Sequence, residues 1–272
     1  MAGDTLTVAL VREVFYEDGG PSLIDCLKRA KDAGAELAVL PEIPLLPWSP
    51  ATKESRDEDT EAPGGAREQI QSLAAREVGI ALVGGTIVTD PDSGERFNTA
   101  LVFDTEGAVI QRYRKIHVPE EPGFWETSHY ECADEGATPV NVLGWSLGVQ
   151  ICSDIMRPMG SHALASHGAD LIVNPRATSR STAGDWILVC RSTAMTTGCY
   201  VLSPTRPRPE QGVELGGPVI AADPNGKLIA ESEDELTLVT LERPALREAR
   251  ADYPGYLPVR NDVYTESFGS VR

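Results

Sequence analysis

Short apolar runs and helically spaced apolar residues alternate along the chain, and they predict strands and helices in turn. Apolar runs predict strands at 6–11, 37–40, 80–88, 98–103, 108–113, 140–143, 145–151, 171–173, 200–202, 217–222, 227–231 and 236–241. Helical spacing predicts helices at 21–33, 66–78, 159–167 and 186–197. In the second of these helices, Ile70, Leu73 and Ala74 are expected to face inward. Strands such as 80–88 are apolar almost throughout, which indicates that both of their faces are covered.

Two long segments interrupt the regular elements. Residues 44–65 are rich in proline and charge and predict a surface loop, and residues 117–137 predict a second long loop. The tail predicts one short helix followed by an extended arm around 253–258. Because there is no internal repeat and no break in composition, we expect one α/β domain over residues 1–272, with a C-terminal arm from about 250 to 272.

Composition narrows the classes of partner. The 272 residues have a formal net charge of −17, which disfavours nucleic acid or an anionic membrane as the main partner, since both need a basic face. The sequence has no apolar run of membrane-spanning length, and its first residues lack a basic leader. The five cysteines are odd in number and show no C-x-x-C spacing, which disfavours a disulfide framework or a metal site. We therefore expect a cytoplasmic protein without a bound metal.

A cysteine at the end of a predicted strand is the main candidate for chemistry. The run 145–151 ends at Cys152, and small or polar residues follow before Pro158. Enzymes with α/β folds place nucleophiles at such turns, because the turn exposes the side chain while the sheet fixes it. Taken alone, a cysteine in this position is more often a buried strand-end thiol.

Two charged residues follow other predicted strands in the same way. Glu42 comes directly after the strand 37–40, and Lys115 follows the strand 108–113. Each alone is more often a solvated surface charge. Loops after strand ends lie on one rim of an α/β sheet, so these residues and Cys152 can converge. A base, a cation and a thiol are what attack on an amide carbon requires, because the thiol loses a proton and an oxyanion forms.

With Glu42, Lys115 and Cys152 at these positions, the sequence resembles the nitrilase superfamily of carbon–nitrogen hydrolases, which uses a Glu-Lys-Cys triad. Each matching stretch is short, but together they cover nearly the whole chain in order. The stretches are 38–42 (AVLPE), 84–86 (GGT), 97–100 (FNTA), 113–117 (YRKIH), 148–154 (GVQICSD), 168–172 (GADLI), 217–226 (GPVIAADPNG) and, more weakly, the tail 250–264.

The resemblance implies a role for each matching residue. Glu42 would be the general base, and Cys152 would attack the substrate and form a thioacyl enzyme. Lys115 would stabilise the oxyanion, together with the backbone N–H that follows the cysteine. A second glutamate of the family orients substrate and lysine. In this sequence Glu126 matches it best.

The neighbouring Glu120 and Glu121 are rivals for that second glutamate.

The resemblance also implies a four-layer α-β-β-α sandwich that needs no cofactor. Such sandwiches pair through one helix layer into a homodimer or larger homo-oligomer, with the C-terminal arm crossing to the partner. The sequence departs from the common pattern at Ser153, where an aromatic residue is usual, at Met159, and in the helix segment 191–197. Ser153 leaves more room beside the thiol and changes the expected substrate size.

Other residues near the predicted strand ends are candidates for binding substrate. Arg176, or else Arg180, follows the strand 171–173 and could hold a substrate carboxylate. Trp125 and His129 could wall the pocket. For all of these residues the alternative is packing or a surface ion pair.

Three functions remain open from the sequence. The motif Cys152-Ser-Asp154 resembles amidases and N-carbamoyl amide hydrolases, so the first is an amidohydrolase that acts on a small linear amide or N-carbamoyl compound and releases ammonia. The second is a nitrilase that converts a nitrile to an acid. The third, from another class, is a binding or regulatory scaffold of the same fold with little turnover. The first two predict a small-molecule amide, carbamoyl or nitrile substrate, whereas the third predicts binding of metabolites or proteins.

Overall fold

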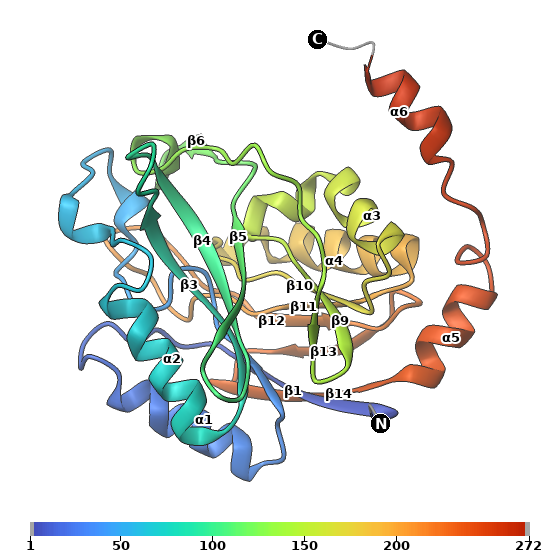
Figure 1. Cartoon of the computed structure of the whole chain (residues 1–272), viewed down its shortest axis with the longest axis horizontal. Helices are drawn as coiled ribbons and strands as arrows, with labels where there is room; N and C mark the ends of the chain where they lie inside the picture. Colours follow the sequence, from blue (N-terminus) through green and yellow to red (C-terminus); the bar gives the residue numbers. More distant parts are fainter. Residues whose placement is uncertain (1–2, 270–272) are drawn as a thin grey trace.

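The computed structural model describes residues 3–269. Two six-stranded sheets form the core of this part of the chain (Figure 1). The first sheet has the order β14 (Leu236–Glu242), β1 (Thr5–Val11), β2 (Leu37–Val39), β3 (Ala81–Thr89), β4 (Arg96–Phe103) and β5 (Val109–Arg114). The second has the order β13 (Leu228–Ser232), β12 (Val219–Ala222), β11 (Tyr200–Ser203), β10 (Leu171–Val173), β9 (Trp145–Val149) and β8 (Val140–Val142). A small hairpin joins β6 (Glu120–Glu121) to β7 (Phe124–Trp125).

Helices cover the outer face of each sheet. The covering helices are α1 (Pro21–Asp32), α2 (Ala66–Val78), α3 (Pro158–Ser166) and α4 (Ala183–Thr197). Helices α5 (Arg243–Ala251) and α6 (Asn261–Gly269) follow β14 in the C-terminal part of the chain. One apolar cluster joins α1 and α2 to the first sheet, and a second fills the space between the sheets and extends under α3 and α4. The layers are therefore helix, sheet, sheet, helix, which confirms the predicted four-layer sandwich (Figure 1).

The direction of the strands brings their carboxyl ends together. In the first sheet β1, β2 and β3 are parallel, and β4 and β5 alternate in direction, so β2 and β5 end at the same edge. In the second sheet β9, β10 and β11 are parallel. The segments that follow β2, β5 and β9 carry the three residues of the predicted triad.

The structure corrects several details of the predicted elements. Leu73 does not face inward, because its side chain on α2 is 45% exposed. The segment 44–65 is not wholly a surface loop, since Trp48 within it is completely buried. The segment 117–137 contains the β6–β7 hairpin as well as buried side chains. The predicted arm also contains α6, and the part of it at 270–272 lies outside the described residues, as do residues 1–2 of the predicted domain.

Candidate active site

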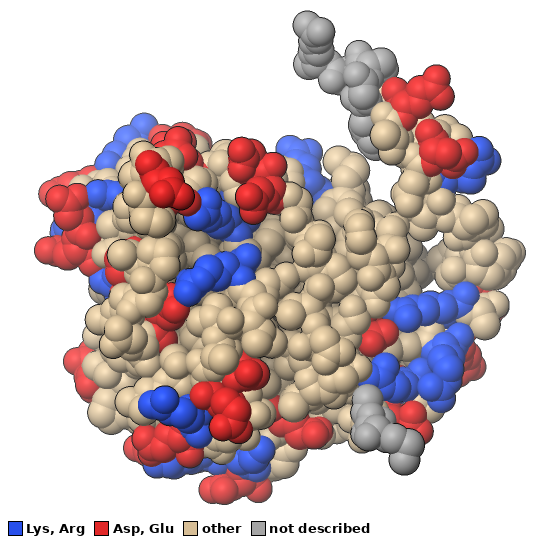
Figure 2. Space-filling view, in the orientation of Figure 1, with Lys and Arg blue, Asp and Glu red and all other residues tan. Residues whose placement is uncertain are grey.

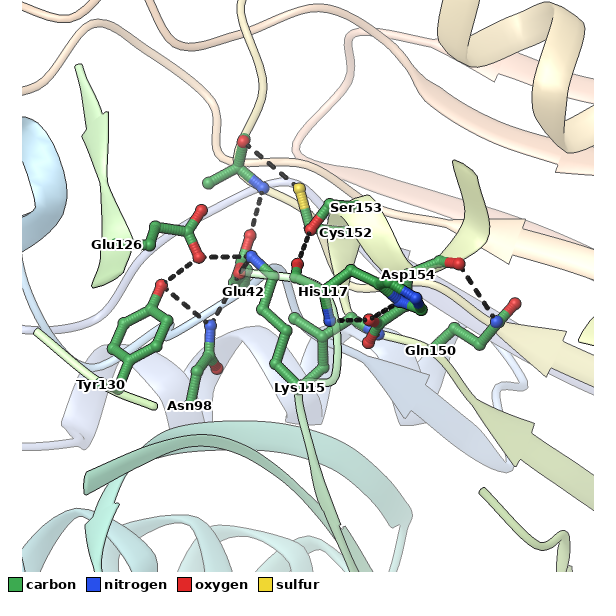
Figure 3. Close-up of polar contacts among 12 residues, drawn as sticks. Glu42, Asn98, Lys115, His117, Glu126, Tyr130, Gln150, Cys152, Ser153 and Asp154 are labelled. Carbon is green, nitrogen blue, oxygen red and sulfur yellow. Dashed lines mark hydrogen bonds and ion pairs between the residues drawn. The ribbon is translucent and has the colours of Figure 1, made fainter. Parts of the chain in front are cut away.

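Glu42 lies on the segment after β2, and its side chain is almost completely buried. Its Oε1 accepts hydrogen bonds from Lys115 Nζ and from Asn98 Nδ2, each at 2.8 Å (Figure 3). Its Oε2 accepts a hydrogen bond from the backbone N–H of Ala177 at 2.9 Å. These three donors reach the carboxylate from three separate segments and fix its orientation.

Lys115 directly follows β5 and is completely buried. Its Nζ lies 2.8 Å from Glu42 Oε1 and 2.5 Å from Glu126 Oε2. Burial by itself lowers the pKa of Lys115, but the two carboxylates outweigh it, so this pKa lies above its ordinary value. The site therefore holds a permanent ammonium between two acidic side chains (Figure 3).

Cys152 begins the 3₁₀ helix Cys152–Met156, three residues after the last residue of β9. Its φ of 46° lies in the left-handed region, which is uncommon for a residue other than glycine. Its Sγ lies 3.6 Å from the carbonyl oxygen of Ala177, the residue whose N–H binds Glu42. One backbone residue thus contacts both the thiol and the carboxylate.

The thiol of Cys152 is protonated in the resting protein. Burial raises the pKa of Cys152 well above its ordinary value, and the carboxylate of Glu42 raises it further, while Lys115 opposes the change. Attack by the sulfur therefore requires a base that removes the proton when the substrate is in place.

Asp154 ties the segment after β5 to the turn that holds the thiol. Its Oδ1 accepts hydrogen bonds from the backbone N–H groups of Ile116 and His117, at 3.2 and 2.8 Å (Figure 3). Its Oδ2 accepts from Tyr113 Oη at 2.8 Å and from the backbone N–H of Ile151 at 3.1 Å. One buried carboxylate thereby fixes the segments on either side of the ammonium and the thiol relative to each other.

Glu126 lies in the 3₁₀ helix that follows β7 and is completely buried. Its Oε2 accepts hydrogen bonds from Lys115 Nζ and Tyr130 Oη, and Tyr130 Oη also accepts from Asn98 Nδ2 at 3.3 Å. Its Oε1 has no hydrogen-bond partner among the described residues. Burial raises the pKa of Glu126, and Lys115 offsets part of that rise. The free oxygen is an acceptor with which a ligand could pair.

Sequence reasoning assigned no role to Asn98, Tyr130 or Asp154, although all three hydrogen-bond within this cluster or its supporting turns. Asn98 could have been found as an amide at the start of the mostly apolar run 98–103, since a buried amide needs partners. Asp154 belongs to a recognised motif but was read only as a marker of substrate class. Tyr130 has no comparable signal in the sequence.

The rivals Glu120 and Glu121 lie away from the buried cluster. Both are exposed on β6, and Glu120 pairs with Lys53 at 3.2 Å. Lys53 Nζ also lies 4.1 Å from the ring centroid of Trp125, which is partly buried and directly precedes Glu126. Trp125 is thus held at the rim beside the glutamate that enters the cluster.

The side chains of His129 and Ser153 each form a hydrogen bond to a backbone carbonyl oxygen of the protein. His129 is buried, and its Nε2 donates to the carbonyl oxygen of Thr52 at 2.7 Å, while its Nδ1 has no hydrogen-bond partner within residues 3–269. Ser153 Oγ donates to the carbonyl oxygen of His117 at 2.5 Å. The small serine side chain thereby lies against the loop after β5 (Figure 3).

Arg176 does not fit the predicted role of binding a substrate carboxylate. Its guanidinium is completely buried and donates to Ser203 Oγ at 3.0 Å, to Thr178 Oγ1 at 2.7 Å and to the carbonyl oxygen of Pro218. Burial lowers the pKa of Arg176 to about 10. The alternative, Arg180, is exposed and forms an ion pair with a surface glutamate. The first arginine therefore supports the loop after β10, because its donors face the protein.

No group of three or more His, Cys, Asp or Glu side chains within residues 3–269 is placed to hold a metal ion. In the same part of the chain, no helix combines the length and the apolar character needed to cross a bilayer. The site consists of acid, amine, thiol and amide groups.

Known proteins resemble this chain in sequence and in fold. The carbon-nitrogen hydrolase family model matches residues 10–251. An omega-amidase, NIT2 of Xenopus tropicalis, is 31% identical over 252 residues, which cover 88% of each chain. The crystal structure of a carbon-nitrogen hydrolase from Helicobacter pylori G27 superimposes with a TM-score of 0.88 at 19% identity, covering 97% of this chain and 98% of that one.

A second solved structure is that of Saccharomyces cerevisiae Nit3, a member of branch 10 of the nitrilase superfamily. It superimposes with a TM-score of 0.83 at 25% identity and covers 96% of this chain and 97% of its own. The predicted resemblance to the nitrilase superfamily is confirmed. The chain therefore belongs to the carbon-nitrogen hydrolase family, whose members are hydrolases of carbon–nitrogen bonds.

Proposed function

We propose that this enzyme hydrolyses a small linear amide or N-carbamoyl compound through a thioacyl intermediate on Cys152 and releases ammonia. The observation that carries the proposal is the buried contact of Lys115 with Glu42 and Glu126, beside a protonated thiol. A base, an ammonium and a sulfur nucleophile in one buried site match the needs of acyl transfer. The omega-amidase names of relatives support an amide as the substrate class.

The acylation step uses Glu42 as a proton carrier. Its carboxylate takes the thiol proton while the sulfur of Cys152 attacks the carbonyl carbon, and the carbonyl oxygen becomes an oxyanion. Lys115 uses two of its three N–H donors on carboxylates of the described residues, so one remains for this oxyanion. When the C–N bond breaks, protonated Glu42 gives its proton to the leaving nitrogen, and ammonia departs.

The deacylation step repeats the same proton transfer with water. Glu42 takes a proton from a water molecule, which attacks the thioester carbon. The carbon–sulfur bond then breaks, the acid product forms, and the sulfur recovers the proton from Glu42. Glu126 holds Lys115 in place, and its unpaired Oε1 can accept an N–H of the substrate amide.

Replacing the nucleophile tests the proposal. Cys152→Ala and Cys152→Ser should each lower kcat for small amides by about 10⁴-fold or more while circular dichroism shows an intact fold. Mass spectrometry of wild type mixed with an amide should show the acyl group on Cys152. Full activity in either variant would refute the proposal. A panel of matched amides, N-carbamoyl compounds and nitriles, each with and without a carboxylate, identifies the substrate, and turnover of nitriles alone would favour a nitrilase.

We further propose that the protein assembles as a homodimer or larger homo-oligomer through α3, α6 and the segment between α5 and α6. A groove of about 740 Å³ lies between α3 and α6, and its lining includes Met159 and Tyr264, which are 51% and 55% exposed. The view in Figure 2 has a broad uncharged area around α3, although the chain has a net charge of −17. A second copy of this chain would cover this apolar surface.

We also propose that the enzyme works in a reducing compartment such as the cytoplasm. All five cysteines lie within the described residues and are free thiols. Catalysis through Cys152 requires that thiol to remain reduced.

A further inference from the structure

Arg206 is completely buried, and all five N–H donors of its side chain bind oxygen atoms of the protein. The guanidinium of Arg206 donates to the backbone carbonyl oxygens of Glu42 at 2.9 Å, Ile43 at 2.8 Å and Leu46 at 2.8 Å. Its other two N–H groups donate to the carboxylate of Glu210 at 2.8 and 2.6 Å. These five hydrogen bonds account for the full donor capacity of an arginine side chain.

The backbone that Arg206 holds is strained. Ile43, directly after the catalytic base, has a φ of 49°. A β-branched residue in the left-handed region is a true outlier, and such a conformation persists only when surrounding contacts enforce it. One nitrogen of Arg206 binds the carbonyl oxygens of both Glu42 and Ile43. The guanidinium therefore holds the bend that aims the Glu42 carboxylate into the site.

The same contacts extend to the loop of the second glutamate. Glu210 Oε2 also accepts the backbone N–H of Trp48 at 3.1 Å. Trp48 Nε1 donates to the carbonyl oxygen of Gly123 at 2.8 Å, and its ring packs edge-on against Phe124 with centroids 5.8 Å apart. Gly123 and Phe124 lie just before Glu126, so both acidic side chains of the site are tied to one buried ion pair.

Stability alone is a weak explanation for this ion pair. The side chains of Arg206 and Glu210 are 0% and 4% exposed. The free energy of removing both charges from water offsets most of their electrostatic attraction. Apolar residues of similar size often make a protein equally stable. A planar guanidinium can, however, fix several carbonyl oxygens in one geometry, which apolar side chains cannot do.

We propose that Arg206, oriented by Glu210, is a positioning residue that sets the catalytic orientation of Glu42; the inference rests on the proposed function of Glu42 as the base. Arg206 acts on the backbone and touches no reacting atom. Its loss should therefore slow the chemical step and leave substrate binding nearly unchanged.

The first test is Arg206→Lys, which keeps the charge but cannot bridge the carbonyl oxygens. We expect kcat for a small amide to fall about 10- to 100-fold, while KM changes less than about threefold. Arg243→Lys is a matched control, because Arg243 also binds backbone carbonyl oxygens, a carboxylate and a tryptophan ring, at the start of α5. It should lose some thermal stability and keep the wild-type kcat. If Arg206→Lys does not fold, Glu210→Gln takes its place, with the same split between kcat and KM expected.

A double-mutant cycle with Glu42→Asp separates positioning from general loosening. In the Glu42→Asp variant, the shorter side chain already displaces the carboxylate. Adding Arg206→Lys to this variant should therefore lower the activity further by less than about threefold. Equal and independent losses in both backgrounds would overturn the inference, as would an unchanged kcat in an Arg206→Lys variant that folds. Either result leaves the proposed function intact if Cys152→Ala is inactive. Activity that survives Cys152→Ala would instead refute the proposed function and this inference with it.

Discussion

At the scale of single residues, the site balances two buried carboxylates against one buried ammonium. Burial raises the pKa of Cys152, and the negative charges of Glu42 and Glu126 raise it further, because ionising the thiol would add another negative charge. The resting site therefore keeps the sulfur neutral. In the proposed mechanism, the proton moves when the substrate carbonyl arrives and its oxygen can receive the new charge beside Lys115.

The same balance predicts a pH dependence of activity. Burial raises the pKa of Glu126, so this carboxyl takes up a proton at a higher pH than a glutamate in water, whose pKa is about 4.3. Its protonation removes a charge that holds Lys115, so kcat/KM should fall as the pH drops through that raised pKa. A pH–rate profile between pH 4 and 9 measures the effect.

Glu126→Gln is the matching variant for this profile. It keeps the side-chain size, and kcat should fall about 10²-fold because the amide holds the ammonium less well. The acidic limb due to this residue should then disappear from the profile. An unchanged profile and rate would show that Glu126 neither titrates in the active range nor supports Lys115.

The sequence allowed us to predict which residues meet in the site, but not all of their partners. Glu42, Lys115 and Cys152 each follow a strand that is visible as an apolar run, so their meeting follows from strand direction. The side-chain direction of Arg176 is not encoded in such a pattern. It depends on whether the loop after β10 turns the guanidinium towards the pocket or, as here, towards Ser203.

At the scale of elements, periodicity predicts regular segments better than it predicts their burial. Helix α2 has the predicted bounds Ala66–Val78, yet Leu73 on it is exposed. The segment 44–65 is polar in composition, but Trp48 within it is buried because this segment folds back over the site. Composition alone does not reveal that a loop is packed against a second loop.

The contact between β3 and α2 gives a testable prediction for Gly84. A Cβ at Gly84 would lie 1.9 Å from Gln71 Oε1, which accepts the backbone N–H of Gly85 at 2.8 Å. Gly84→Ala should therefore lower the free energy of unfolding by about 1–3 kcal/mol, because the buried glutamine must move. Urea denaturation followed by circular dichroism measures this change.

Gly184→Ala is the control for that measurement. Gly184 lies near the start of α4, and a Cβ there would meet nothing within 4 Å. Alanine also favours the helix, so this variant should be as stable as wild type or slightly more stable. A Gly84→Ala variant as stable as wild type would contradict the close packing of α2 on β3.

At the scale of the whole molecule, charge and apolar side chains are unevenly distributed. The chain has a net charge of −17, yet exposed apolar side chains gather on α3, on α6 and on the segment between α5 and α6. Helix α6 lies away from the body of the protein (Figure 1). On α6, Val263 and Tyr264 are 43% and 55% exposed, which favours assembly with a second copy.

A charge placed on this surface should weaken that assembly. Met159→Glu puts a carboxylate into the groove between α3 and α6, and desolvating it in an interface is unfavourable. Light scattering after size exclusion should give a multiple of 29.2 kDa for wild type and a smaller mass for the variant. Leu73→Glu, at a similarly exposed position on α2, should keep the wild-type mass. A monomeric wild type would contradict the proposed assembly.

Ala177 contacts Glu42 and Cys152 through its backbone, so the amino-acid type at this position can vary. The group that binds the base is a main-chain amide, and the group beside the sulfur is a main-chain carbonyl. Replacing the side chain of Ala177 removes neither backbone group. Proline is the exception among the common amino acids, because it has no backbone N–H to donate. Related enzymes can therefore differ in residue type at this position and still share the contact, so a search for invariant side chains would overlook it.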